Sequence, residues 1–308
     1  MTWDPHRLPD LAGRIYAVTG ATGGIGYFAA EQLAAAGAEV VLASRSAEKL
    51  NRASATLKER APRAVTHQVQ IDLASLTSVE AAADRFAAFP RLDGIFLNGG
   101  PMQFSGRART EDDLPLLLGT HVVANVALIS RLLPFLTERG SGPSDGRIVH
   151  ASTSFVKQFP MRLDDLGRTP RTGIAAYVKA KTATEVFAYE LDRRIRAAGL
   201  PVSSILTHPG VGVDAKTPHR TGVRDETVRY QRNPYTPWAQ GKDAAAWSGV
   251  RALTDPHAQG GEYYGPARGA RGEPIRIEAN PATAHPASDI AADVWSYLAD
   301  ASGTGSML

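Results

Sequence analysis

Short apolar runs alternate with longer segments of helical periodicity along the first two thirds of the chain. The runs are short enough to be buried strands, and they cover residues 15–18, 39–43, 65–71, 93–97, 147–151 and 202–207. Apolar positions recur with helical spacing over 25–36, 47–60, 76–88, 116–136 and 174–198. Strands that alternate with helices imply parallel pairing and right-handed crossovers. The pattern therefore predicts an α/β fold, a doubly wound parallel sheet with helices on both faces.

Residues 211–238 break this alternation. The segment is long, basic, poorly periodic and rich in proline and aromatic residues. Loops of this length in compact domains usually carry function. Because it follows the sixth predicted strand, we expect it to form a substrate lid.

The last part of the chain returns to regular structure. We expect a helix over 243–253, a strand over 262–264 and an amphipathic helix over 289–301. The last helix is predicted to pack through one face, formed by Ile290, Val294, Tyr297 and Leu298. Residues 302–308 are rich in Gly and Ser and are predicted to fray. With no internal repeat in view, residues 1–308 are predicted to form one domain.

Composition narrows the functional classes. Apolar residues make up 43% of the 308 positions, charged residues 21%, and the formal charge is only +3. The basic residues are scattered, so we expect no nucleic-acid partner. Absence of cysteine removes disulfides, Cys-based zinc sites and a thiol nucleophile. With no secretory signal or run of about 18 apolar residues, we expect a cytoplasmic protein without a membrane partner.

The segments that follow the predicted strands are nearly all small or polar. In open parallel sheets, ligands bind beyond the carboxyl ends of the strands. This rule predicts one site distributed over six loops, at residues 20–26, 44–45, 72–73, 98–100, 151–153 and 209–211.

A glycine-rich turn links the first strand to the first helix. Such a turn places backbone N–H groups and a positive helix end against a phosphate. Gly20 permits the tight turn, Gly24 lets the backbone approach the anion, and Gly26 lets the helix pack closely on its strand. The turn therefore predicts a nucleotide site formed by Thr19, Gly20, Thr22, Gly24, Ile25 and Gly26.

Tyr177 and Lys181 lie one turn apart on a predicted helix. A free tyrosine has a pKa of about 10 and exchanges protons poorly near neutrality. An ammonium group one turn away stabilises the phenolate and lowers that pKa. The pair is therefore a candidate acid/base centre.

Taken together, these motifs resemble the short-chain dehydrogenase/reductase family, nearest its retinol-dehydrogenase-like branch. The resemblance spans about residues 11–300, with its motifs in family order. The matching segments are Thr19-Gly20-x-x-x-Gly24-Ile25-Gly26, Ser44-Arg45, Asp72-Leu73-Ala74-Ser75-Leu76, Leu97-Asn98-Gly99-Gly100, Tyr177-x-x-x-Lys181 and His208-Pro209-Gly210. Leu163-Asp164-Asp165-Leu166 and Gly260-Gly261-Glu262-Tyr263-Tyr264-Gly265-Pro266 also resemble that branch.

The resemblance implies a single Rossmann-type domain and reversible hydride transfer between a nicotinamide cofactor and a carbonyl or alcohol. Tyr177 would be the acid/base, and Lys181 would hold the nicotinamide ribose and depress the pKa of Tyr177. The family's catalytic serine corresponds to Ser152 or Thr153; register slightly favours Thr153. Homodimers and homotetramers through the two long helices are common in the family.

This chain departs from the family pattern at two places. The family's Asn-Asn-Ala-Gly turn is here Asn98-Gly99-Gly100-Pro101, and the relay asparagine has no good match. Its place falls on His121 or Thr120, and Asn125 is a turn away. His121 can hold a water or donate a proton, so an altered relay is implied.

Cofactor choice depends on the residues that end the second strand. A carboxylate there would bind a ribose 2′-OH, whereas the chain has Ser44-Arg45. The guanidinium fork of Arg45 suits phosphate oxygens, so we predict NADP(H). The remaining predicted cofactor contacts are Asp72, Leu73, Asn98, Gly99, Gly100, Tyr177, Lys181, Pro209, Gly210 and Val211.

We therefore expect an NADP(H)-dependent carbonyl reductase or alcohol dehydrogenase that acts on an apolar or cyclic small molecule. Metal is not expected, because the histidines lack metal-ligand spacing. Two alternatives remain. A sugar-nucleotide epimerase or dehydratase shares the Tyr/Lys pair, and an NADP(H)-binding regulator with degenerate catalysis would explain the altered motifs.

Overall fold

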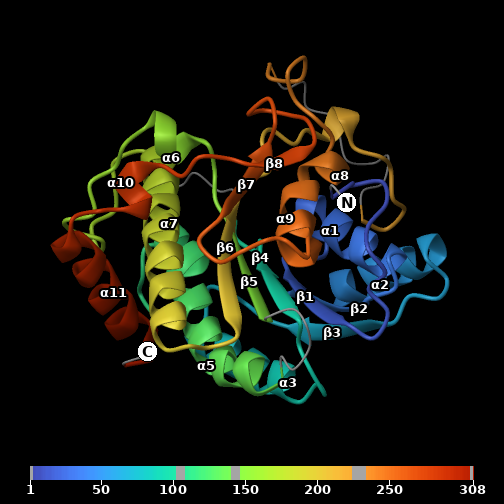
Figure 1. The fold of residues 1–308 in the computed structure, drawn as a ribbon, viewed down its shortest axis with the longest axis horizontal. Coiled ribbons are helices and arrows are strands. Elements are labelled where there is room, and N and C mark those ends of the chain that lie inside the picture. The colour runs from blue at the N-terminus through green and yellow to red at the C-terminus, as the bar shows by residue number, and fades with distance from the viewer. Residues whose placement is uncertain (1–2, 102–107, 140–145, 224–233, 306–307) are drawn as a thin grey trace.

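A mostly parallel, eight-stranded sheet forms the centre of the computed structural model, which describes residues 3–101, 108–139, 146–223, 234–305 and 308 (Figure 1). The strand order is β3-β2-β1-β4-β5-β6-β7-β8, and only β8 runs antiparallel to its neighbour. The strands are β1 Ile15–Thr19, β2 Glu39–Ser44, β3 Thr66–Gln70, β4 Gly94–Leu97, β5 Gly146–Ala151, β6 Val202–Thr207, β7 Tyr263–Pro266 and β8 Pro274–Arg276.

Helices cover both faces of the sheet (Figure 1). One face packs against α3 (Leu76–Ala87), α5 (Ala124–Arg139) and α7 (Gly173–Ala197), and α11 (Ser288–Ser302) packs in turn on α5 and α7. The other packs against α1 (Gly24–Ala35), α2 (Ala47–Arg60) and α9 (Trp247–Thr254). The shorter helices are α4 (Leu116–Leu118), η1 (Gly119–Val123), α6 (Phe155–Gln158), η2 (Asp214–Lys216), α8 (Lys242–Ala245) and α10 (Pro281–Ala284).

The central strands are apolar because both of their faces are covered. Every residue of β1 and β4 is buried, which is typical of parallel sheets between two helical layers. The predicted doubly wound sheet is confirmed, and its six main strands begin and end within two residues of the predicted positions.

The long apolar helix differs from the prediction. Its second turn is a π-helix, Gly119–Val123, and the helix continues through Pro134 to Arg139, beyond the predicted end at residue 136. Phe135 and Leu136 are buried directly after Pro134, and this burial outweighs the loss of one backbone hydrogen bond. Within the described part of the chain, Leu116–Thr137 is the one helix long and apolar enough to cross a membrane, and 83% of its most apolar window is buried inside the protein.

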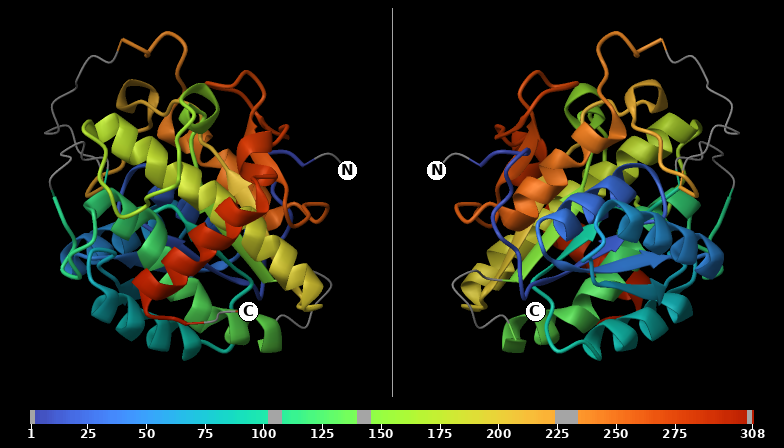
Figure 2. Two further views of the ribbon diagram at one scale, coloured as in Figure 1. Left: turned by 90° about the vertical axis from the view of Figure 1, so that its left-hand side faces the viewer. Right: turned by 90° about the vertical axis from the view of Figure 1, so that its right-hand side faces the viewer.

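The face through which α11 packs was predicted only in part. Val294 and Leu298 are buried as expected, whereas Ile290 is 41% exposed. The buried stripe is instead centred on Trp295, which stacks on Phe187 of α7 with 5.4 Å between ring centroids. Figure 2 shows α11, in red, crossing α7, on which it packs. The large indole determines which side of α11 faces the core, because it buries the most apolar area.

Candidate active site

The glycine-rich turn after β1 packs directly on the turn after β4. Gly20 has φ +68°, and a Cβ there would lie 3.0 Å from the Cα of Gly99. A Cβ on Gly26 would lie 2.4 Å from the carbonyl oxygen of Gly20. The amide N–H of Gly99 donates to Thr19 Oγ1 at 2.9 Å, and Asn98 Nδ2 donates to the Thr19 carbonyl at 3.3 Å. The altered Asn98–Pro101 turn therefore still joins the first and fourth strands.

A cavity of about 300 Å³ opens beyond the carboxyl ends of β1, β2, β3 and β4. Nine predicted cofactor residues line it: Thr19, Gly20, Thr22, Ser44, Arg45, Asp72, Leu73, Gly99 and Gly100. It also contains Ser46, Lys49, Ile71, Ala74, Pro101, Leu116 and Thr120. The predicted residues Gly24, Ile25, Gly26 and Asn98 do not line the cavity, and Gly26 and Asn98 instead hold the turns together.

The electrostatics of this cavity suit an anion at its β2 end. Arg45 and Lys49 both line it, and neither side chain has an ion-pair partner among the described residues. Ser46 caps the N-terminus of α2 by accepting from the Lys49 amide at 3.3 Å. Two cations and a helix N-terminus together stabilise negative charge. Lys49 could have been recognised from the sequence, because it lies one helical turn beyond Arg45.

Tyr177 and Lys181 project from α7 toward the end of β5. Tyr177 is 8% exposed, and the side chain of Thr153 hydrogen-bonds to it. Lys181 Nζ lies 5.9 Å from the centroid of the Tyr177 ring and donates to the Ala151 carbonyl at 2.5 Å. The arrangement brings a phenol, a hydroxyl and an ammonium group together at the carboxyl edge of the sheet.

Burial dominates the protonation of these groups. It raises the pKa of Tyr177 to about 12, and the Thr153 hydrogen bond opposes that rise. The pKa of Tyr177 thus lies above its ordinary value instead of below it, because desolvation penalises the phenolate. Burial also lowers the pKa of Lys181 to about 8, while Glu185 opposes this shift.

Ser152 and Thr153 point to different partners. Ser152 is buried and donates to Glu185 Oε1 at 2.6 Å. Glu185 also accepts from Tyr263 at 2.9 Å. Of the two hydroxyls, that of Thr153 hydrogen-bonds to Tyr177. Glu185 lies one turn beyond Lys181 on the same helix, so the spacing 177, 181, 185 is the sequence signal that could have identified it.

The structure places His121 beside Tyr177. The buried imidazole comes from the π-helical turn η1, a feature that often occurs at functional sites. Its Nε2 lies 3.1 Å from the Pro101 carbonyl. The hydroxyl of Thr120, the alternative relay residue, donates to the Leu116 carbonyl of its own helix at 2.6 Å. The amide of Asn125 donates to the His121 carbonyl at 2.9 Å.

The segment after β6 is held from two sides. Val211 donates its amide to the Ala270 carbonyl at 2.9 Å, and the Pro209 carbonyl accepts from Gln240 Nε2 at 2.9 Å. A Cβ on Gly210 would lie 2.4 Å from the Ala270 oxygen. Pro209, Gly210 and Val211 are therefore fixed at the same edge of the sheet, although they do not line the 300 Å³ cavity.

The predicted lid at 211–238 is described in two parts, because residues 224–233 lie outside the described residues. The first part is joined to α1 by a bidentate ion pair between Arg220 and Glu31, at 2.6 and 2.7 Å. In the second part, Tyr235 and Trp238 are exposed. Its closure over a substrate stays a prediction.

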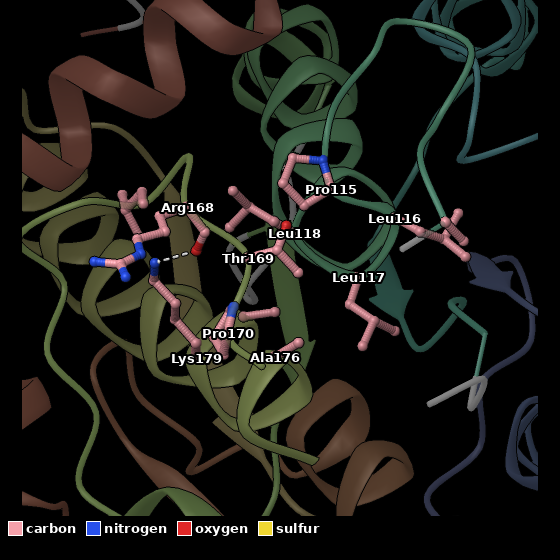
Figure 3. A pocket seen from close by; sticks show the side chains of 12 residues that line it. Pro115, Leu116, Leu117, Leu118, Arg168, Thr169, Pro170, Ala176 and Lys179 are labelled. Atoms are coloured by element: carbon pink, nitrogen blue, oxygen red, sulfur yellow. Dashed lines mark hydrogen bonds between the residues drawn. The ribbon is translucent and has the colours of Figure 1, made fainter. Parts of the chain in front are cut away.

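A small apolar cavity of about 20 Å³ lies behind the tyrosine helix, between α4 and α7 (Figure 3). Lys179 borders it and donates to the Arg168 carbonyl at 2.8 Å, as well as to the Asp165 carbonyl. This lysine holds the 163–170 loop onto α7. It is therefore distinct in role from Lys181, which lies one turn from Tyr177.

Comparison with known proteins agrees with this geometry. The family model for short chain dehydrogenase matches residues 14–221. The chain is 31% identical to mouse polyprenol dehydrogenase over 259 residues, which cover 83% of this chain and 76% of that protein. It spans between 52% and 66% of the other curated relatives compared.

Two solved structures show the same fold. An uncharacterised protein from Mycobacterium paratuberculosis superposes with a TM-score of 0.77 at 26% identity, covering 99% of this chain and 98% of that one. A putative short chain dehydrogenase from Escherichia coli, solved with NADPH, gives a TM-score of 0.63 at 23% identity, covering 84% and 98%. The fold, the motif order and these matches confirm the sequence-based prediction: the chain belongs to the short-chain dehydrogenase/reductase family.

Proposed function

We propose that this family member is an NADP(H)-dependent oxidoreductase that interconverts a carbonyl and a secondary alcohol on an apolar or cyclic small molecule. The observation that carries the proposal is the contact between Thr153 and the Tyr177 phenol, next to Lys181, at the carboxyl edge of the sheet. Along the same edge lies the cavity that contains Arg45.

The cofactor is NADP(H). The 300 Å³ cavity lies at the glycine-rich turn, and Arg45 and Lys49 line it without ion-pair partners among the described residues. Asp72, the acidic residue in the lining, accepts from the Ala74 amide at 2.9 Å. The β2 end of the cavity thus offers two cations for a 2′-phosphate. Bound there, the cofactor supplies or accepts the hydride.

The chain's own residues then manage the proton and the substrate oxygen. With its pKa raised to about 12, Tyr177 is a protonated phenol at neutral pH, so it is ready to donate to the oxygen of a carbonyl substrate. Thr153 donates a second hydrogen bond to that oxygen, because its hydroxyl already lies at the phenol. We assign this role to Thr153 instead of Ser152, whose hydroxyl is taken by Glu185.

Lys181 and His121 are assigned supporting roles. The ammonium group of Lys181 holds the ribose hydroxyls and stabilises negative charge that develops on Tyr177. His121 supports an altered proton relay. Cofactor contacts are assigned to the residues that line the cavity and, around it, to Gly24, Ile25, Gly26, Asn98, Pro209, Gly210 and Val211.

Turnover of a carbonyl panel tests the proposal. NADPH oxidation is followed with aromatic and alicyclic ketones, for the wild type and for Tyr177→Phe. We expect turnover of at least one ketone and a loss of about 100-fold or more in kcat in Tyr177→Phe. Tyr297→Phe, on α11, is the matched control and should keep the wild-type rate. Tight NADPH binding without turnover of any carbonyl would favour the regulatory alternative.

We also propose a cytoplasmic protein with a small-molecule substrate and no membrane or nucleic-acid partner. Burial of the apolar helix Leu116–Thr137 supports this, because its apolar side chains are used in the core. A homodimer or homotetramer through the two long helices is also proposed, and α11 packs on part of α5 and α7. Cell fractionation and light scattering check the location and the assembly.

A further inference from the structure

A second cavity, of about 150 Å³, shares Thr153 with the candidate active site. Glu185, His208 and Tyr263 contribute to its wall, and all three are buried. The exposed charges of Lys157 and Glu278 also border it, with opposite sign. Because Thr153 also hydrogen-bonds to Tyr177, a substrate whose oxygen meets Tyr177 has this cavity as its neighbour.

Glu185 offers an acceptor to this cavity. The side chain is 1% exposed, and its Oε1 accepts from both Ser152 and Tyr263. Within the described part of the chain, Thr283 is the one donor to its Oε2, at 2.8 Å. A carboxylate oxygen has two lone pairs, so Oε2 keeps capacity for one more donor.

His208 offers a donor. The imidazole is 5% exposed, and its Nδ1 accepts from the Gly210 amide at 3.2 Å. Burial lowers the pKa of His208 to about 4, so the ring is neutral at pH 7 and its single proton is on Nε2. Among the described residues, nothing hydrogen-bonds to Nε2. The ring packs edge-on against Tyr263, whose hydroxyl donates to Glu185.

We propose that this cavity is a subsite for a second hydroxyl group of the substrate, in which His208 Nε2 donates to the hydroxyl oxygen and Glu185 Oε2 accepts its hydrogen. The inference rests on the proposed function, since it names the substrate class of the same site. A second carbonyl can only accept, so it would leave Glu185 unmatched, and a carboxylate would meet the like charge of Glu185. A hydroxyl satisfies both partners, and the substrate is therefore a hydroxylated ketone or the corresponding diol.

The kinetic test compares 2-hydroxycyclohexanone with cyclohexanone as NADPH-dependent substrates. A hydroxyl that makes two buried hydrogen bonds should raise kcat/KM about tenfold or more over the parent ketone. In His208→Asn, the amide oxygen can still accept from Gly210 while the Nε2 donor is lost, and we expect the ratio to fall toward one. His208→Gln, whose longer amide reaches toward the Nε2 position, should restore part of the preference.

Two further variants accompany this test, a control away from the cavity and a second variant of the proposed subsite. Tyr189→Phe removes a buried hydroxyl one turn beyond Glu185 that does not line the cavity, so the ratio should stay at its wild-type value. If His208→Asn does not fold, Glu185→Gln is used, because its amide N–H would face the bound hydroxyl and the preference should again be lost.

A binding measurement separates this inference from the proposed function. Calorimetry compares trans-1,2-cyclohexanediol with cyclohexanol on the NADP-loaded protein, which requires no turnover. Tighter binding of the diol that disappears in His208→Asn supports the subsite even if no ketone is reduced. Turnover of both ketones with equal kcat/KM and equal binding of both alcohols would overturn the subsite and leave the proposed function intact.

Discussion

The imidazole of His121 lies edge-on against the phenol of Tyr177, with 5.6 Å between ring centroids and 81° between ring planes. Because a carbonyl can only accept, Nε2 must donate to Pro101, and Nδ1 is left as an acceptor. Nδ1 is buried, and no described residue hydrogen-bonds to it. Burial lowers the pKa of His121 to about 3, so the ring is neutral at pH 7. A neutral acceptor beside the Tyr177 phenol suits the relay water of the proposed mechanism.

Replacing this histidine tests the relay. His121→Phe keeps an aromatic ring against Tyr177 and removes both nitrogens, so we expect kcat to fall about tenfold with little change in the KM for NADPH. His121→Asn supplies a polar side chain of the family's type and should recover part of the loss. Equal kcat values for the wild type and His121→Phe would show that the imidazole takes no part.

Charge removal at the β2 end of the nucleotide cavity tests the cofactor contacts. Arg45→Ala and Lys49→Ala each remove one cation from the cavity lining. We expect each to raise the KM for NADPH about 10- to 100-fold while that for NADH barely changes, since NADH lacks the 2′-phosphate. Arg52→Ala is the control, because Arg52 pairs with Glu48 at 3.4 Å and does not line the cavity. Equal effects on both cofactors would contradict the assignment.

Acid should destabilise the fold through its buried histidines. Burial lowers the pKa of His121 and His150 to about 3 and that of His208 to about 4. Between these values and about 6.5, the unfolded chain binds protons that the folded chain does not. The contribution of these three neutral histidines to the free energy of unfolding is therefore present above about pH 6.5, and it is lost as the pH drops toward 4.

His150→Gln isolates one of these contributions away from the reacting groups. His150 lies within β5, where its Nε2 is 3.1 Å from Ser204 Oγ. Urea unfolding at pH 7, 6 and 5 should show a pH slope about 1.4 kcal/mol per unit shallower in the variant than in the wild type. Parallel slopes would mean that His150 is not titrating on unfolding.

Trp295 should be the main anchor of α11. It stacks on Phe187, and the Arg194 guanidinium lies 4.0 Å from the centroid of the indole ring. Trp295→Ala should lower the free energy of unfolding by about 3–5 kcal/mol. Ile290→Ala, on the exposed side of the same helix, should change it by less than about 0.5 kcal/mol. Urea titration of both variants gives the comparison, and equal losses would place the anchor elsewhere.

Periodicity was sufficient to predict the sheet because its strands are short, apolar and separated by long amphipathic helices. It was insufficient for β8 and α6, which have too few residues to show a period. The π-helical turn at His121 also has no signature in the hydrophobic pattern. For α11, Ile290 and Trp295 lie on neighbouring stripes, and only tertiary packing decides between them.

The candidate site was also predictable from the sequence only in part. Strand-end positions predicted Thr19 and Arg45, because the carboxyl ends of parallel strands meet at one edge. The one-turn spacing of Tyr177 and Lys181 on a helix predicted that pair. Which of Ser152 and Thr153 hydrogen-bonds to Tyr177 depends on the direction of each side chain, and the sequence does not show that direction. Glu185 and His208 lie 23 positions apart in sequence, and only the fold brings them to one cavity.

Close packing of Gly26 on the Gly20 carbonyl gives the first turn a double function. The glycines that shape the nucleotide cavity also seal the contact between the first and fourth strands, so the fold and the cofactor depend on the same atoms. A side chain added there would loosen the whole sheet edge together with the binding surface. Variants of Arg45 and Lys49, which line the cavity but lie outside this turn, should change affinity without this penalty.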